Sequence, residues 1–330
     1  DHGSPYRPTE WLCLGKTPIA RFALPMGSYL LILHKPGYSP VRVPVTISRQ
    51  AEESCEVTLY RDEEVPAGFV QVAGGKFEYQ GPKAGGGPKE TKEVDDFFLA
   101  KFPITCREYL EFLNYLAASD AEQAAKRVPR KAATAGEYWP KGFDGQYVIP
   151  TEAWVAAAPE PLKAKAAKLE NIPVWWEEAW PVCSVSWEDL MAYASWKREQ
   201  TGLVVSLPHA IAWEKAARGT DGRVYPWGRE VDAMFCNMNQ SHAQGMRPAV
   251  VDSFPADESP CGVRGLGGNS RDIVLNDPGE KYPGWRLCRG GGWGSAGTSL
   301  RTACRMGCPA SVVVCGFGGR VACSVRCRTP

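Results

Sequence analysis

The most restrictive feature of the sequence is a segment near the C-terminus that is almost free of charge. Residues 294–319 contain no Asp, Glu, Lys, Asn, Gln or His, although 23% of the chain is charged. Gly, Ser, Ala, Cys and Val make up most of the segment, and Arg301 and Arg305 are its only charged residues. It follows Arg289-Gly290-Gly291-Gly292-Trp293, whose glycines allow close backbone packing and whose Trp can anchor that backbone in a core.

Two interpretations fit this segment. Short apolar runs broken by Gly and Pro are typical of buried strands, and composition alone favours that interpretation. The second interpretation is a surface with exchangeable side chains on a backbone that a few fixed residues hold in place: Trp293, Leu300, Arg301, Arg305, Pro309 and Arg320. Composition leaves both interpretations open.

Length and charge predict a globular chain of two or three domains that does not bind nucleic acid. The chain has 330 residues, with 38 Lys and Arg against 37 Asp and Glu, so no net field attracts nucleic acid or an acidic membrane. The sequence contains no run of 18 apolar residues, so it predicts no membrane-spanning helix. Because the chain opens with the polar stretch Asp1-His2-Gly3-Ser4-Pro5, we expect any export signal to have been removed.

The cysteines do not predict a zinc site. Six of the twelve fall between Cys288 and Cys327, which argues against a disulfide framework spread over the chain but leaves disulfides open. The close pairs are Cys304/Cys308 and Cys323/Cys327, and the four histidines are scattered, so neither type has zinc-site spacing.

The first part of the chain predicts a small β-sandwich over residues 1–62. Alternating apolar runs predict strands at 19–24, 29–34, 41–47 and 55–60, separated by turn signals such as Pro36-Gly37. The segment resembles the PEGA module of bacterial envelopes through three motifs: Gly15-Lys16-Thr17-Pro18, Leu24-Pro25-Met26-Gly27-Ser28-Tyr29 and Lys35-Pro36-Gly37-Tyr38. This resemblance implies a spacer.

The remainder, residues 63–330, predicts an α+β domain with two long helices and one shorter one. Thr105 with Glu108 forms a capping box ahead of an amphipathic helix, and Ser186 can cap a second helix that begins at Trp187. A third helix follows Pro208 and ends at Gly219. Residues 117–170, rich in Ala, Lys, Glu and Pro, predict a solvated insertion with broken helices outside the core.

An ordered series of motifs then resembles the formylglycine-generating-enzyme family over about residues 66–325. The motifs are Pro181 to Trp187, Leu207-Pro208, Trp213-Glu214-Lys215-Ala216-Ala217-Arg218-Gly219, Tyr225-Pro226-Trp227-Gly228, Asn237, Pro248 to Pro255, Gly268-Asn269 and Arg289 to Trp293. This resemblance implies that family's variant of the C-type lectin fold, in which helices flank twisted antiparallel sheets. It also implies a ligand face formed largely by the last strands.

The enzymatic chemistry of that family does not carry over to this sequence. Its copper-binding cysteines correspond to Gly297 and Thr302 when the family's arginine is aligned on Arg305, and neither residue can be a thiolate ligand. Cys304 and Cys308 are out of register, and four isolated histidines cannot supply the His-x-x-x-His-x-Glu motif of the iron-dependent relatives. We therefore expect no catalysis and no required cofactor.

The same fold also serves the variable proteins of diversity-generating retroelements, which residues 289–320 resemble. In that class, adenine-rich codons at surface positions are rewritten by error-prone reverse transcription. Rewriting an Asn codon that keeps its third-base C gives access to Gly, Ala, Ser, Cys and Val but not to Lys, Glu or Met. Met306 does not fit this set, and Gly316-Phe317-Gly318-Gly319-Arg320 departs from the family's Gly-Phe-Arg ending.

This resemblance implies fourteen variable, ligand-contacting positions: Gly292, Gly294, Ser295, Ala296, Ser299, Cys304, Met306, Gly307, Cys308, Ala310, Ser311, Val313, Val314 and Cys315. A backbone held by ladder hydrogen bonds would tolerate changes at these positions, because such bonds do not depend on side-chain identity. The small apolar side chains predict a shallow hydrophobic patch or pocket.

Calcium is a candidate structural ion. Asn237, Asn269 and Asp272 stand near positions that resemble the family's calcium ligands, and a hard cation needs several oxygen donors. The usual Trp and Glu residues of that motif are replaced here by Arg271, Asp272 and Ile273. The alternative is that Asn269 simply caps a turn.

Together these patterns predict a non-enzymatic, ligand-binding protein at a bacterial cell surface or outer envelope. We expect a monomer, anchored by a lipid at a processed N-terminus and binding a protein or another cell-surface ligand. The alternatives are a copper-dependent formylglycine-generating oxidase and a structural scaffold whose C-terminal segment is buried.

Overall fold

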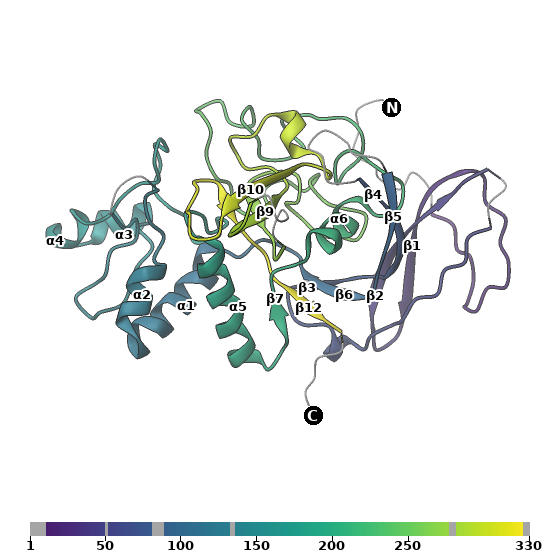
Figure 1. The fold of residues 1–330 in the computed structure, drawn as a ribbon, viewed down its shortest axis with the longest axis horizontal. Coiled ribbons are helices and arrows are strands. Elements are labelled where there is room, and N and C mark those ends of the chain that lie inside the picture. Colours follow the sequence, from purple (N-terminus) through teal and green to yellow (C-terminus); the bar gives the residue numbers. More distant parts are fainter. Residues whose placement is uncertain (1–10, 50–51, 81–88, 133–135, 277–281, 326–330) are drawn as a thin grey trace.

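The computed structural model describes residues 11–49, 52–80, 89–132, 136–276 and 282–325. Figure 1 shows an elongated molecule with a two-stranded ribbon at one end of its long axis and short helices at the other. Within the described residues, no helix combines the length and apolarity needed to cross a bilayer.

The N-terminal part forms two of the four strands predicted from sequence. Strands β1 (Gly27–Lys35) and β2 (Tyr38–Ile47) pair antiparallel, and a single bridge joins Tyr38 to Arg61. The structure assigns no strand at 19–24 or 55–60, so the predicted four-stranded sandwich is wrong in the described region. Ile19 and Phe22 are exposed, so their segment has no buried face to organise a second sheet.

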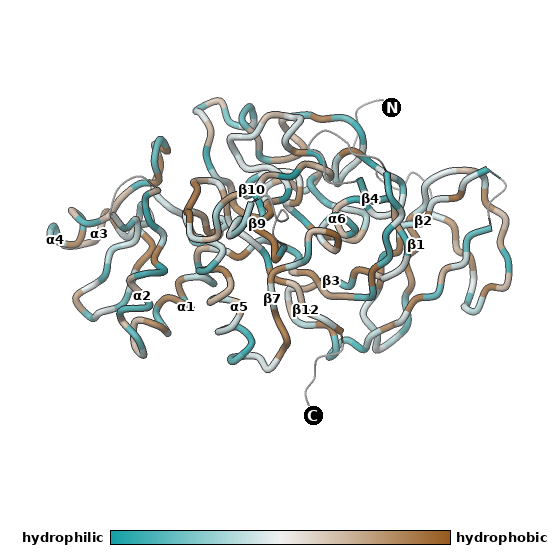
Figure 2. The backbone as a smooth tube through the Cα atoms, viewed as in Figure 1, coloured by the Kyte–Doolittle hydropathy of each residue, from teal (hydrophilic) through white to brown (hydrophobic). Residues whose placement is uncertain are grey.

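Two four-stranded sheets make up the body of the molecule. One sheet has the order β3-β6-β12-β7 and brings the C-terminal strand into its interior. Its strands, all paired antiparallel, are β3 (Phe69–Val72), β6 (Phe97–Ala100), β7 (Val205–Ser206) and β12 (Ala322–Ser324). Figure 2 shows hydrophobic residues along β3 and β7 near the middle of the molecule.

The second sheet carries the C-terminal segment and has the order β10-β9-β8-β11. Its strands are β8 (Arg271–Ile273), β9 (Trp285–Arg289), β10 (Arg305–Pro309) and β11 (Phe317–Gly318). Strands β10, β9 and β8 pair antiparallel, whereas β11 runs parallel to β8. A hairpin of β4 (Gly75–Gln80) and β5 (Lys89–Val94) lies apart from both sheets.

The capping residues predicted from sequence begin the two longest helices. Thr105 caps α1 (Cys106–Ser119) in a capping box with Glu108, and Ser186 caps α5 (Trp187–Thr201) in a capping box with Asp189. Helix α6 (Ala210–Arg218) ends at Gly219, which has a positive φ of 68°. Because these signals are local in the chain, the sequence locates the helices closely.

The predicted insertion at 117–170 does contain broken helices, but it is not a solvated excursion. It holds the end of α1 together with α2 (Ala121–Arg127), α3 (Glu152–Ala157) and α4 (Glu160–Lys163). Tyr138, Trp139 and Leu169 are almost fully buried in the largest core cluster. Average composition hid these scattered large side chains, so the prediction that the insertion lies outside the core was wrong.

Candidate functional site

Between Trp293 and β11 the C-terminal segment alternates between exposed and buried residues, and Leu300, Cys308 and Val313 are among the buried ones. After Gly292 the chain makes a tight turn, in which Ser295 N donates to Gly292 O and Gly292 N donates to Ser295 Oγ. It then forms a 3-10 helix, η2 (Gly297–Leu300), followed by β10 at the edge of its sheet. Backbone contacts define part of the course of the segment, and the side chain of Ser295, one of the fourteen candidate positions, supports its first turn.

The fourteen candidate positions fall into three groups by exposure. Five have exposed side chains or backbone: Gly294, Ala296, Met306, Ser311 and Cys315. Six are half-buried: Ser295, Ser299, Cys304, Gly307, Ala310 and Val314. The last three are buried and cannot present a side chain to a ligand, contrary to expectation: Gly292, Cys308 and Val313.

A buried charge network holds the base of this segment. Glu214 on α6 is fully buried, and its Oε2 atom accepts from Arg289 Nη2 at 2.5 Å. Arg305 Nη2 lies 3.5 Å from the same oxygen, and Arg218 Nη2 lies 3.4 Å from Oε1. Burial lowers the pKa of Arg289 and of Arg218, and the Glu214 carboxylate counteracts that effect. One carboxylate thus contacts three guanidinium groups: Arg218 lies one turn away on α6, whereas Arg289 and Arg305 come from the distant C-terminal part of the chain.

A second buried ion pair secures the end of the segment. Arg320 Nε donates to Asp272 Oδ2 at 2.6 Å, and Trp213 Nε1 donates to the same oxygen at 2.7 Å. Arg320 also donates to the carbonyl oxygens of Arg264 and Gly265, at 3.0 and 2.9 Å. Of the fixed residues predicted from sequence, Trp293, Leu300 and Arg320 are buried and the Arg305 side chain nearly so, Pro309 is half-buried, but Arg301 is exposed and anchors nothing.

Two neighbouring residues extend the exposed face and escaped sequence reasoning. Val231 and Met246 are 41% and 50% exposed. A Cβ atom at Gly297 would stand 3.3 Å from Val231, and one at Gly294 would stand 3.5 Å from Met246 Sδ. We call Gly294, Ala296, Gly297, Val231 and Met246 the apolar rim. Because the segment 231–246 has no periodic pattern, only the fold could place it beside residues 294–297.

The positions assigned to copper ligands by the family resemblance carry no thiol. Gly297 lies on η2. Thr302 is buried, its hydroxyl lies 3.1 Å from the carbonyl oxygens of Arg223 and Val224, and its backbone N–H donates to Val224 O. Thr302 therefore ties the segment to the 223–224 loop. Within the described residues, no group of three or more His, Cys, Asp or Glu side chains is arranged to hold a metal.

The three candidate calcium ligands do not form an oxygen shell as they stand. Asn269 Oδ1 accepts from Asn237 Nδ2 at 2.9 Å and from Ala249 N at 3.0 Å, so it is already used within the protein. Asp272 Oδ2 accepts from the guanidinium of Arg320, whereas Asp272 Oδ1 and Asn237 Oδ1 are buried without a hydrogen-bond partner among the described residues. The backbone of Asn269 has a positive φ of 69°, which fits a residue that shapes a turn.

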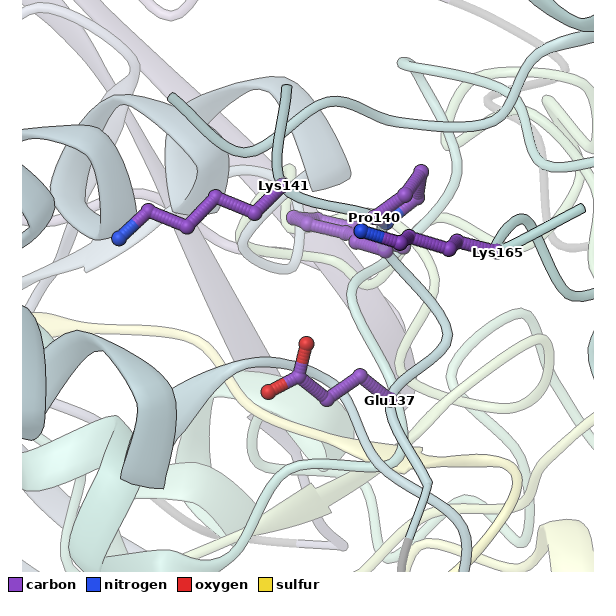
Figure 3. Close-up of a pocket in the computed structure, with 5 residues that line it drawn as sticks. Glu137, Pro140, Lys141 and Lys165 are labelled. Carbon is purple, nitrogen blue, oxygen red and sulfur yellow. The ribbon is translucent and has the colours of Figure 1, made fainter. Parts of the chain in front are cut away.

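Two hollows open on the side of the insertion. One, of about 350 Å³, is lined by Glu137, Trp139, Pro140, Lys141 and Lys165, and Figure 3 shows the Glu137 carboxylate across the gap from both lysines. Burial raises the pKa of Glu137, and Lys141 opposes that shift. The other, of about 470 Å³, lies between Thr151 and Arg247 and includes Trp175. Neither hollow is lined by any of the fourteen positions.

Comparison with known proteins places most of the chain in one family. The sulfatase-modifying factor enzyme 1-like domain (FGE-sulfatase) matches residues 57–325. An inactive Cα-formylglycine-generating enzyme 2 from Bos taurus is 26% identical over 279 residues, covering 72% of this chain and 82% of that protein. A formylglycine-generating enzyme from Thermomonospora curvata is 29% identical over 177 residues, covering 51% of this chain and 55% of that protein.

A solved structure supports the same fold. Treponema denticola variable protein 1 superposes with a TM-score of 0.51 at 13% identity, over 77% of this chain and 94% of that one. At this identity the likeness speaks for the fold alone. The relatives thus include a protein named inactive and one named as an enzyme, so membership by itself does not decide catalysis. Because the domain match spans well over half of its length, the chain belongs to the sulfatase-modifying factor enzyme 1-like domain family.

Proposed function

We propose that this protein is a non-enzymatic ligand-binding protein whose C-terminal segment is diversified by a diversity-generating retroelement. The observation that carries the proposal is the contrast between backbone and side chains over 292–315. Three of the fourteen positions are buried, which leaves eleven with some exposure, while Glu214, Arg289 and Trp293 below them are buried. A scaffold whose stability comes from buried residues can change its exposed side chains, and so its ligand, without losing its fold.

The exposed face suits a macromolecular ligand better than a small molecule. Small and apolar residues make up its exposed positions, and the rim residues Val231 and Met246 widen it. Deep pockets that enclose most of a ligand are the usual sites for small molecules, whereas exposed apolar patches mark contacts with other surfaces. We therefore propose a protein or another cell-surface ligand as the partner, and a monomer as the displaying unit.

The proposed setting is a bacterial cell surface or outer envelope. The N-terminal β1 and β2 ribbon would act as a PEGA-like spacer between a lipid anchor and the ligand-binding domain. No cofactor is needed for this role, and the Gly and Thr residues at the two copper positions support a protein without oxidase activity.

A substitution series tests the exposed face. Met306→Asn and Ser311→Asn should each change the free energy of unfolding by less than about 0.5 kcal/mol, because both side chains are exposed. Val313→Asn should cost roughly 2 kcal/mol or more, since it buries an unpaired amide. Its neighbour Val312, 42% exposed, provides the matched control Val312→Asn, which should be tolerated. Urea unfolding measures the free energy of unfolding of all four variants. Equal losses of stability in the four would contradict the proposal that the exposed positions can vary freely.

Catalysis separates this proposal from the oxidase alternative. The copper-loaded protein should leave a peptide containing Cys-x-Pro-x-Arg unchanged, as judged by mass spectrometry over many hours. Conversion of its cysteine to formylglycine would overturn the proposal, because it would require a copper site that Gly297 and Thr302 cannot form. Sequencing the neighbouring DNA would test diversification directly: we expect a near-identical repeat with adenines at the exposed codons, beside a reverse transcriptase.

A further inference from the structure

The thiols of Cys288 and Cys308 are in contact between strands β9 and β10. Their Sγ atoms are 3.4 Å apart, although the residues are 20 positions apart in the chain. Cys288 lies on β9 and Cys308 on the neighbouring strand β10, and both are buried. Sequence reasoning gave Cys304, Cys308 and Cys315 as variable positions, whereas the structure places Cys308 against a partner thiol.

Strand register explains why the two thiols meet. Cys288 stands opposite Met306, and Cys308 stands opposite Arg286. Because alternate residues of a strand share a face, Met306 and Cys308 point to the same side of the sheet as Cys288. The two cysteines are therefore diagonal neighbours on one face of an antiparallel pair, and any change of register by one residue would separate them.

We propose that Cys288 and Cys308 form a disulfide that bonds the edge strand β10 to β9. A disulfide bond is about 2.05 Å long, so the sulfur atoms must approach by about 1.4 Å. Because diagonal neighbours on an antiparallel pair have Cβ atoms farther apart than a disulfide usually spans, side-chain rotation must be joined by a shift of the edge strand β10 toward β9. This inference rests on the sulfur geometry alone and does not depend on the proposed function. Such a bond would link β10, the strand that carries Met306, covalently to β9.

The chemistry needs an oxidant, which is a small-molecule disulfide such as oxidised glutathione. The Cys308 thiolate attacks one of its sulfur atoms and releases a first thiol, and the Cys288 thiolate then attacks Cys308 Sγ and releases a second. Two protein thiols and one small disulfide thus become one protein disulfide and two small thiols, which carry away both protons. Cys308 is the slightly more exposed residue of the two, at 5% against 0%, and it lies on an edge strand.

The environment of the pair supports this order of attack. The hydrogen bond from Cys288 lowers the pKa of the Cys308 thiol from its ordinary value, although burial opposes the shift. The same hydrogen bond and burial raise the pKa of the Cys288 thiol. Since the thiolate is the attacking species, Cys308 should react first and Cys288 should resolve the mixed disulfide.

Peptide mapping of the intact chain tests the bond. The protein is incubated with oxidised glutathione, dialysed, alkylated without reduction and digested with trypsin. We expect the tripeptide Leu287-Cys288-Arg289 to be found linked to the peptide 306–320, with fragmentation placing the link at Cys308 and not at Cys315. Separately alkylated Cys288 and Cys308, or a link at Cys315, would overturn the proposal.

Thermal unfolding provides a second readout that single variants can check. The oxidised protein should melt about 5 °C above the protein reduced with dithiothreitol, because the bond closes a loop of about twenty residues. Cys308→Ala and Cys288→Ala should abolish this difference. Cys261→Ala, at a buried cysteine of another core cluster, should preserve it. A redox shift that survives in Cys308→Ala would show that another pair is responsible and would refute the assignment.

Discussion

Replacing Glu214 with glutamine should lower the free energy of unfolding by about 3–5 kcal/mol, because three buried guanidinium groups would lose their shared counter-charge. Arg218 and Arg289 are almost fully buried, and Arg305 is nearly so, which leaves water little chance to replace the carboxylate. Glutamine keeps the shape of the side chain, so the loss reports the charge and not a cavity. For a domain of this size the melting temperature should fall by roughly 10 °C.

The same substitution on the surface is the matched control. Glu122 forms an ion pair with Lys126 on α2, and both side chains are well exposed. Glu122→Gln should therefore cost less than about 0.5 kcal/mol. Denaturant unfolding of both variants gives the comparison. Similar midpoints for Glu214→Gln and Glu122→Gln would mean that the buried network does not hold the C-terminal segment.

The stability of the Glu214 network bears on whether the exposed side chains of the C-terminal segment can vary. Arg289 lies ahead of η2 in the chain and Arg305 lies after it. Because both contact Glu214, the network fixes the chain to α6 on either side of η2. Arg305 also donates to Gln80 O at 2.7 Å, and its guanidinium stacks over Tyr79. We therefore expect the exposed positions between Arg289 and Arg305 to tolerate substitution, whereas the charge network and the buried residues Trp293, Leu300 and Thr302 should carry the stability of the segment.

Sequence reasoning located those parts of the fold whose signals are local. Thr105 and Ser186 each begin a helix as expected, since a capping box involves residues only three positions apart. The family resemblance rested on ordered motifs and is confirmed by the domain match over residues 57–325. Strand ends were less certain: the predicted strands 29–34 and 41–47 correspond to β1 (Gly27–Lys35) and β2 (Tyr38–Ile47).

The failures concern contacts between distant residues. Whether the segment 19–24 becomes a strand depends on a facing partner, and in this structure Phe22 has none. The insertion was judged by average composition, yet Trp139 and Tyr138 insert into the main core. Exposure along 292–315 was the hardest to predict. Val312 and Val313 are identical side chains one residue apart, and only the turn geometry places one outside and the other inside.

Arg320→Lys is the second substitution for which we expect a large loss, about 3 kcal/mol. Lysine keeps the positive charge but has a single nitrogen, whereas the Arg320 guanidinium bonds Asp272 and the carbonyls of Arg264 and Gly265 from separate N–H groups. The Arg320 side chain and Asp272 are buried, and the bonds to the carbonyl groups of Arg264 and Gly265 are part-buried. Any acceptor left unpaired there pays its full desolvation cost.

Arg301→Lys is its control, because Arg301 belongs to the same segment and is exposed. We expect that variant to unfold at the same urea concentration as the parent protein, and Arg320→Lys to unfold at a clearly lower one. Equal midpoints would mean that Arg320 does not fix the end of the segment. Arg320 follows two glycines that leave no room for side chains: a Cβ at Gly318 would lie 2.3 Å from Val182 O and one at Gly319 would lie 2.9 Å from Leu190. The unusual Gly-Phe-Gly-Gly-Arg ending therefore lets the chain pass between β8 and α5 and deliver a buried guanidinium to Asp272, which closes the frame behind the exposed face.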